Sequence, residues 1–185
     1  MDAWIRQIEE ADAEGELRRV YEEIRVKRGR VSNVMKAQSL DPESIKLHLD
    51  LYVHLMFGKS TLDRLDREMI AVVVSHFNNC SYCVTHHSEA LLRHSKDLRL
   101  QGELERHAFE NISPKARAML QYAIKLTEHP EKIMKTDIDK LRTAGLSDDA
   151  ILRVNLITSY FNFVNRIVSG LGVLLEDKES RIYNY

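Results

Sequence analysis

The sequence predicts an all-α protein, and three observations lead to that prediction. Only seven glycines and three prolines occur among 185 residues, so few positions favour turns or break helices. Apolar residues recur at helical spacing behind residues that cap helices. No alternation of apolar and polar residues runs far enough to indicate a sheet. A chain of this length can bury one core, so we expect a single all-α domain over residues 1–185.

The first half of the chain is expected to hold three helices. Apolar residues line one side of residues 11–27, and Pro42 opens a helix that continues to Gly58. Ser60 and Asp63 resemble a capping box, with Asp in place of the usual Glu or Gln, so a helix should follow over residues 62–77. The run Val72-Val73-Val74 would also suit a strand, but the spacing of Leu62, Leu65, Met69 and Val73 favours a buried helix.

The second half continues in the same way. A helix is expected from Cys80 to about His94, followed by a polar loop or short helix over residues 95–112. Three further helices are expected to start at Ser113-Pro114, where an N-cap precedes proline, at Thr136 as N-cap, and at Ser147. The last of these, residues 147–169, is apolar nearly all the way round, which predicts burial by a neighbouring subunit as well as by its own core.

The net charge, the apolar runs and the number of cysteines limit the partners and the cellular location that we expect. The formal net charge of −1 gives no indication of nucleic acid or of an anionic membrane. No stretch approaches the roughly 20 apolar residues of a membrane span, and the start of the chain does not resemble a signal peptide. The chain has only two cysteines, in C-x-x-C spacing, so we do not expect a secreted disulfide scaffold. We expect the protein to reside in the cytoplasm.

The stretch N-N-C-S-Y-C-V-T-H-H holds both cysteines and is the strongest candidate site. At about 100° per residue, Cys80, Cys83 and His87 fall within roughly 60° on one helix face, whereas His86 points elsewhere. A helix N-terminus favours the reactive thiolate, two thiols at this spacing can form a disulfide, and an imidazole carries protons near neutral pH. The cluster therefore suits thiol redox chemistry.

Glu68 is a candidate acid or base for the same site. It shares a helical stripe with Leu65, Val72 and Ser75. Burial of a carboxylate on such a stripe costs free energy unless the group is hydrogen-bonded or takes part in the chemistry of the site. A hairpin of the two helices would aim Glu68 at His87.

Plainer interpretations stay open beside this one. One such interpretation is that Cys80 and Cys83 are buried structural thiols. Zinc is a third interpretation, with Glu68 and His87 completing the ligands, although a second C-x-x-C or H-x-x-x-H is lacking. His86 is expected to be solvated or to act from outside the site, and polar packing or subunit contacts are expected for Asn162, Asn165 and Arg166.

The stretch E-M-I-A-V-V-V-S-H-F-N-N-C-S-Y-C-V-T-H-H resembles the signature of the alkylhydroperoxidase D-like (AhpD-like) proteins, in the carboxymuconolactone decarboxylase superfamily. The positions that match the signature are Glu68, Ser75, Cys80, Cys83 and His87. The G-R-V-S-N turn, L-R-T-A-G-L-S-D-D-A-I and F-N-F-V-N-R-I-V-S-G-L-G-V look like those of the peroxidase-related branch, so the resemblance covers most of the chain.

This resemblance implies an all-helical homo-oligomer, commonly a trimer or hexamer, that reduces hydroperoxides. Cys83 would attack the peroxide, Cys80 would supply a proton and then close the disulfide, and Glu68 and His87 would relay protons. No flavin or nicotinamide fingerprint is present, so an external dithiol, of thioredoxin or lipoyl type, is expected as reductant. One departure is Tyr82, which stands where the best-studied branch has histidine and whose phenol is a poor base at neutral pH.

Two other functions remain as alternatives. One is an acid–base decarboxylase or lactone-processing enzyme that uses Glu68 and His87. The other is a redox-sensing oligomer without enzymatic turnover. Substitution of Cys83 by serine distinguishes the first alternative, because acid–base chemistry could survive it.

Overall fold

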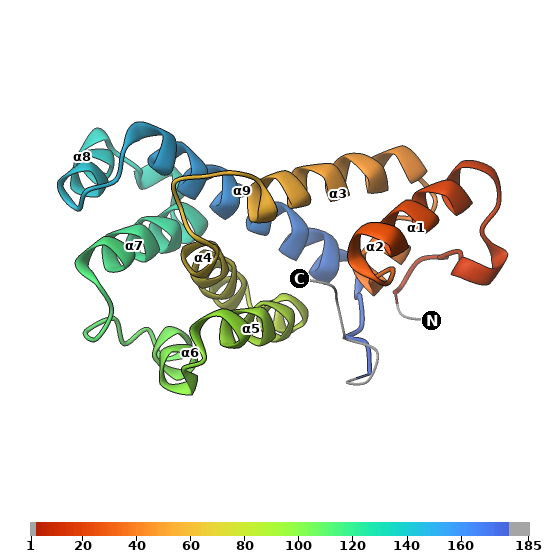
Figure 1. Ribbon diagram of the computed structural model, residues 1–185, viewed down its shortest axis with the longest axis horizontal. Helices are drawn as coiled ribbons and strands as arrows, with labels where there is room; N and C mark the ends of the chain where they lie inside the picture. The colour runs from red at the N-terminus through yellow and green to blue at the C-terminus, as the bar shows by residue number, and fades with distance from the viewer. Residues whose placement is uncertain (1–2, 178–185) are drawn as a thin grey trace. The chain divides into compact units, whose positions relative to one another are not determined.

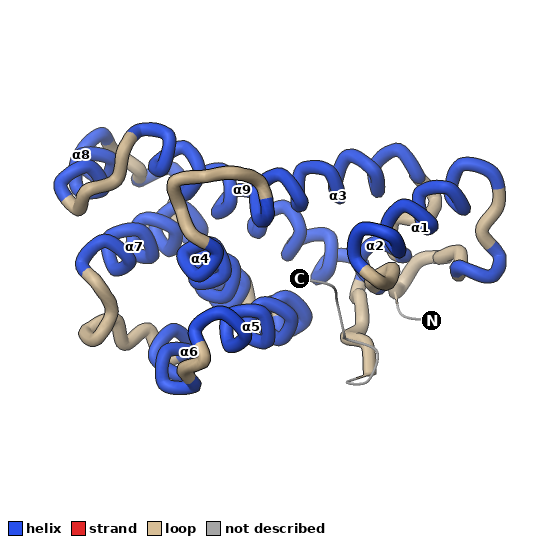
Figure 2. Tube along the Cα trace, in the orientation of Figure 1, coloured by secondary structure: helices blue, strands red, loops and turns tan. Residues whose placement is uncertain are grey.

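The computed structural model describes residues 3–177, apart from the side chain of Glu105, and this part of the chain is helical (Figures 1 and 2). Residues 3–177 contain no strand, so the all-α prediction is confirmed. The α-helices are α1 Gly15–Arg28, α2 Asn33–Lys36, α3 Pro42–Phe57, α4 Arg64–Phe77, α5 Ser81–Ser95, α6 Leu98–Glu105, α7 Pro114–Glu128, α8 Lys135–Thr143 and α9 Asp148–Leu171. Of two short 3₁₀ helices, η1 Glu10–Asp12 precedes α1 and η2 Pro130–Lys132 lies between α7 and α8.

Most predicted helices lie where the sequence put them, but two caps differ. The capping box of Ser60 and Asp63 was wrong. Asp63 is itself the N-cap of α4, and its carboxylate accepts a hydrogen bond from the backbone N–H of Asp66 at 2.8 Å. The Ser60 hydroxyl accepts from the N–H of Leu62 at 3.1 Å, one turn too early to cap α4.

The cap at Thr136 was also wrong. Helix α8 begins at Lys135, so Thr136 lies inside its first turn, and the N-cap position is Met134. There the Asp137 carboxylate reaches back and accepts from the N–H of Met134 at 2.9 Å. At α7 the prediction is confirmed, because Ser113 accepts from the N–H of Ala116 and Pro114 opens the helix.

The tertiary contacts divide the chain into two compact units. The first consists of residues 1–54 with 166–185, of which the structure describes 3–54 and 166–177, and the second consists of residues 55–165. The single-domain expectation stays a prediction.

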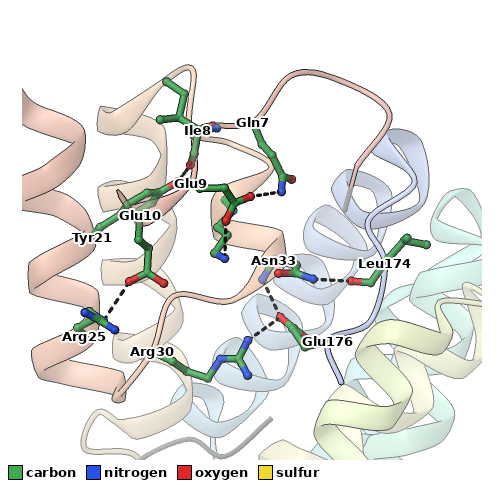
Figure 3. Close-up of polar contacts among 12 residues, drawn as sticks. Gln7, Ile8, Glu9, Glu10, Tyr21, Arg25, Arg30, Asn33, Leu174 and Glu176 are labelled. Carbon is green, nitrogen blue, oxygen red and sulfur yellow. Dashed lines mark hydrogen bonds and ion pairs between the residues drawn. The ribbon is translucent and has the colours of Figure 1, made fainter. Parts of the chain in front are cut away.

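The first unit is held by polar contacts around the short helix α2 (Figure 3). Its backbone N–H at Asn33 donates to the Glu176 carboxylate at 2.6 Å, and the Asn33 amide donates to the carbonyl of Leu174 at 3.0 Å. From the other end of the chain, Glu9 pairs with Lys36 at 2.8 Å. Segments near both ends of the chain are therefore fixed to α2.

The second unit is built around α4, which packs against α5, α6 and α7 (Figure 1). All residues of α4 from Asp66 to Ser75 are buried, including the valine run, so the helical interpretation of that run is confirmed. Arg67 is part of this buried stretch, and its guanidinium donates to four backbone carbonyls at or just after the end of α3: Leu55, Met56, Gly58 and Leu62. This charged clamp ties the end of α3 to the start of α4.

Candidate functional site

The candidate site starts at the turn that joins α4 to α5. Asn79 adopts the left-handed conformation with φ 53°. Its N–H donates to the carbonyl of His76, and the N–H of Cys80 donates to the carbonyl of Ser75, both at 2.9 Å. This pair of bonds is a Schellman motif with asparagine in the position that usually holds glycine. Cys80 is at once the last residue of this motif and the N-cap of α5, so the turn that ends α4 fixes the place of the first thiol.

Both cysteines lie at the start of α5 and close together. Cys83 follows Cys80 by one turn, in the first turn of the helix, and both are thiols rather than a disulfide, with exposed fractions of 4% for Cys83 and 3% for Cys80. The unpaired N–H groups at a helix N-terminus favour negative charge, and so favour thiolate there. The two thiols are thus buried in the isolated chain but lie in the part of the helix that best supports their ionised form.

The structure brings Glu68 and His87 together across the α4–α5 hairpin. The Glu68 side chain is 0% exposed, and its Oε2 lies 2.7 Å from Nδ1 of His87. Burial by itself raises the pKa of Glu68, but the charges and hydrogen bonds of His87 and Arg64 together lower that pKa below its ordinary value. An ionised carboxylate only accepts, so Nδ1 carries a hydrogen and Nε2 is the ring nitrogen that can accept a proton.

Arg64 is the one member of this cluster that the sequence analysis missed. Its Nε donates to Oε1 of Glu68 at 2.7 Å, and its Nη2 lies 2.5 Å from the same oxygen. The four-residue spacing between Arg64 and Glu68 was the available signal, since residues i and i+4 face each other on a helix.

The surroundings of His87 and its neighbour are aromatic. The His87 ring meets the ring of Phe161 edge to face at 4.6 Å. His86 is buried and packs against Tyr82 with ring centroids 4.6 Å apart, so the expectation that it is solvated was wrong. The physical reason is a second buried stripe on α5, formed by Tyr82, His86 and Ala90 at four-residue spacing.

A polar network fixes the end of α4 just before the thiols. Asn165 donates to the hydroxyl of Ser75 at 3.1 Å, and Asn78 donates to the amide oxygens of Asn165 and Asn162 at 2.9 and 3.0 Å. Asn162 in turn donates to the hydroxyl of Thr127 on α7 at 3.0 Å. Asn162 and Asn165 therefore serve as polar packing, as expected, and tie α9 and α7 to the turn that positions Cys80.

The described side chains also bear on metal and membrane binding. Within residues 3–177, no three or more His, Cys, Asp or Glu side chains group so as to hold a metal ion, so the zinc interpretation finds no ligand set there. In that same part of the chain, no helix combines the length and apolar character that crossing a membrane requires.

Comparisons with known proteins agree with this geometry. Residues 42–123, which contain Glu68, Cys80, Cys83 and His87, match the carboxymuconolactone decarboxylase family. A crystal structure of an uncharacterized peroxidase-related protein from Silicibacter sp. TM1040 is 32% identical, with a TM-score of 0.85 over 97% of this chain and 94% of that one.

A second crystal structure and a curated relative extend the likeness. An uncharacterized peroxidase-related protein from Ralstonia eutropha JMP134, described as an alkylhydroperoxidase AhpD core, is 26% identical, with a TM-score of 0.85 over 96% of this chain and 94% of that one. The uncharacterized protein YdfG of Bacillus subtilis (strain 168) is 26% identical over 139 residues, 71% of this chain and 88% of the relative. On its sequence, its fold and its C-x-x-C hairpin, the chain belongs to the AhpD-like proteins of the carboxymuconolactone decarboxylase family.

Proposed function

We propose that the protein reduces hydroperoxides with Cys80 and Cys83 as a redox pair and with Glu68 and His87 as a proton relay. The observation that carries the proposal is the 2.7 Å contact between Nδ1 of His87 and the buried Glu68 carboxylate, one helical turn beyond Cys83. The contact leaves Nε2 of His87 as a base on the helix face that also carries the thiols.

The first step oxidises Cys83. Neutral His87 takes the thiol proton at Nε2, and Glu68 stabilises the imidazolium that results. The Cys83 thiolate attacks one peroxide oxygen, so that a sulfur–oxygen bond forms and the oxygen–oxygen bond breaks. The alkoxide or hydroxide that leaves takes a proton from the imidazolium or from the Cys80 thiol, and Cys83 becomes a sulfenic acid.

The second step closes the disulfide. The sulfur of Cys80 attacks the sulfenic sulfur of Cys83, a sulfur–sulfur bond forms, and water leaves. An external dithiol then returns both thiols by exchange and is itself oxidised, so each cycle passes two electrons from that dithiol to the peroxide. We propose cytoplasmic residence because such a cycle needs a reducing compartment.

Burial of the thiols suggests which peroxides react best. Cys80 and Cys83 are 3% and 4% exposed, and the His87 side chain is 11% exposed. We expect hydrogen peroxide and small alkyl hydroperoxides to react faster than bulky ones such as cumene hydroperoxide, because access to the buried sulfur limits the larger molecules.

The test compares Cys83→Ser and Cys80→Ser with the wild type in a peroxide-consumption assay with dithiothreitol or dihydrolipoamide. We expect no turnover with Cys83→Ser, and with Cys80→Ser a sulfenic acid that dimedone traps at Cys83. Turnover that survives in Cys83→Ser would refute the peroxidase proposal. If that variant also converted a carboxylated lactone, the acid–base alternative would replace it.

A homo-oligomer is part of the proposal. On the 148–165 stretch of α9, Leu152, Leu156 and Phe163 are exposed in the isolated chain, which supports burial by another copy. We expect light scattering to show an oligomer such as a trimer or hexamer, and a monodisperse monomer would contradict it.

A further inference from the structure

We propose that Arg64 is a positioning residue that keeps the relay acid Glu68 ionised and holds it in the orientation that orders His87. The inference rests on the proposed function for its role in turnover. The charge and orientation of Glu68, however, can be measured without any turnover.

The geometry divides the Glu68 carboxylate between two partners. Oε1 faces the Arg64 guanidinium, with Nε at 2.7 Å and Nη2 at 2.5 Å, and Oε2 faces Nδ1 of His87 at 2.7 Å. Because Glu68 is 0% exposed, bulk water does not stabilise either oxygen. Each oxygen depends on one neighbouring side chain, and a guanidinium on Oε1 leaves Oε2 for the imidazole.

The two partners of Glu68 differ in the conditions under which they carry a positive charge. His87 is neutral in the form that accepts the thiol proton, whereas an arginine stays protonated throughout the working range of pH. In that neutral state His87 still donates a hydrogen bond, but Arg64 is the neighbour whose charge still opposes the desolvation of Glu68. Without Arg64, a buried Glu68 beside neutral His87 would tend to take up a proton from solvent and donate it in a hydrogen bond to Nδ1, so the ring hydrogen would move to Nε2 and Nδ1 would no longer be a donor.

Arg64 is itself held in place by the end of α3. Its guanidinium lies over the ring of Phe57, 3.9 Å from the centroid, and its Nη1 donates to the carbonyl of Met56 at 3.2 Å. Its side chain is only 17% exposed. A planar guanidinium can stack on the ring and at the same time donate hydrogen bonds to the carbonyl and to the carboxylate. The single ammonium group of a lysine cannot make all three contacts in this geometry.

The nearest other charges on α4 are Asp66, which is paired, and Arg67, which is bonded to backbone carbonyls. Two residues before Glu68 on α4, Asp66 pairs with Lys115 of α7 at 3.0 Å. The charges that act most strongly on Glu68 come from His87 of α5 and from Arg64. Removal of the Arg64 charge should therefore appear directly in the titration of Glu68.

The experiment uses the full chain with Arg64→Gln and Arg64→Lys. The matched control is Lys135→Gln, which breaks the exposed i,i+4 pair between Lys135 and Asp139 on α8. Carboxyl ¹³C NMR follows the titration of Glu68, ¹⁵N NMR reports the tautomer of His87, and the rate of thiol oxidation by hydrogen peroxide is measured from pH 4 to 9.

We expect the pKa of Glu68 to rise by about 1 to 3 pH units in Arg64→Gln, since an opposite charge at this distance lowers a carboxyl pKa by that amount. The acid limb of the oxidation rate should move with it, kcat should fall while KM changes little, and Arg64→Lys should restore part of the shift. Lys135→Gln should leave both the titration and the rate profile unchanged.

The outcomes separate the inference from the proposed function. If Arg64→Gln, or Arg64→Met should the glutamine variant not fold, left the Glu68 titration within about 0.3 pH unit of the wild type, the role of Arg64 would be refuted. If the titration moved but the wild-type protein consumed no peroxide, the peroxidase proposal would fail and Arg64 would still be the residue that sets the charge of Glu68.

Discussion

Replacement of Glu68 by glutamine should reverse the tautomer of His87. In the wild type both carboxylate oxygens accept, Oε1 from Arg64 and Oε2 from His87. Glutamine keeps the size of the side chain but has one accepting oxygen and one donating NH₂ group. If its oxygen continues to accept from Arg64, its NH₂ faces Nδ1 of His87. That nitrogen must then accept, so the imidazole hydrogen moves to Nε2.

The expected loss of activity follows from this reversal. With hydrogen on Nε2, His87 can no longer take the Cys83 proton at that nitrogen, and general-base catalysis contributes about 10²- to 10⁴-fold. We therefore expect thiol oxidation at pH 7 to slow by that factor. We also expect the free energy of unfolding to fall by about 3–5 kcal/mol, because the buried Arg64 charge loses its ionic partner. For a chain of this size that lowers Tm by about 2–4 °C per kcal/mol.

Stopped-flow oxidation of the pre-reduced protein by hydrogen peroxide measures the rate, well below the Tm of the variant. ¹⁵N NMR of the imidazole identifies the tautomer. A variant that oxidised within about threefold of the wild-type rate and kept hydrogen on Nδ1 would refute the assigned role of Glu68, since the rate loss expected for a general base is far larger.

Three further predictions concern stability. Burial lowers the pKa of His48 to about 4, against about 6.5 in the unfolded chain. The free energy of unfolding should therefore fall by up to about 3 kcal/mol as the pH is lowered from 6.5 to 4. Urea unfolding of His48→Gln should show a flatter pH dependence than that of the wild type. Arg67→Met leaves the carbonyls at the end of α3 without their donor and should cost about 2–4 kcal/mol in the same assay, with Arg19→Met, an exposed position on α1, as a near-neutral control. Asn79→Gly should be tolerated, whereas Asn79→Val should lower the free energy of unfolding by about 1–3 kcal/mol, because the φ of 53° at position 79 disfavours β-branched residues. Equal stability of the two variants would contradict the assigned turn.

The sequence allowed the hairpin and its pairing to be predicted because helical periodicity fixes which residues share a face. Glu68 on one helix and His87 on the next could therefore be expected to meet, and they do at 2.7 Å. The caps were harder to assign. Both Ser60 and Asp63 have side chains that suit an N-cap, and the point at which the chain turns helical, Arg64, decides for Asp63. Burial of His86 was missed because it depends on how many faces of α5 are covered, which spacing within one helix does not reveal.

Two local rules point in opposite directions for Arg64: its four-residue spacing to Glu68 favours a pair, but its place at the start of α4 does not. It is the first residue of α4, where the unpaired N–H groups make the helix end positive and favour acidic side chains. An arginine there is locally unfavourable, so its spacing to Glu68 did not by itself decide where the side chain lies. Its position makes sense only with the Glu68 carboxylate one turn ahead and the Phe57 ring beneath it, contacts that depend on how α3 ends. Natural sequences tend to break local preferences where function requires it, and the residue that does so here is the one that holds the acid of the proposed relay.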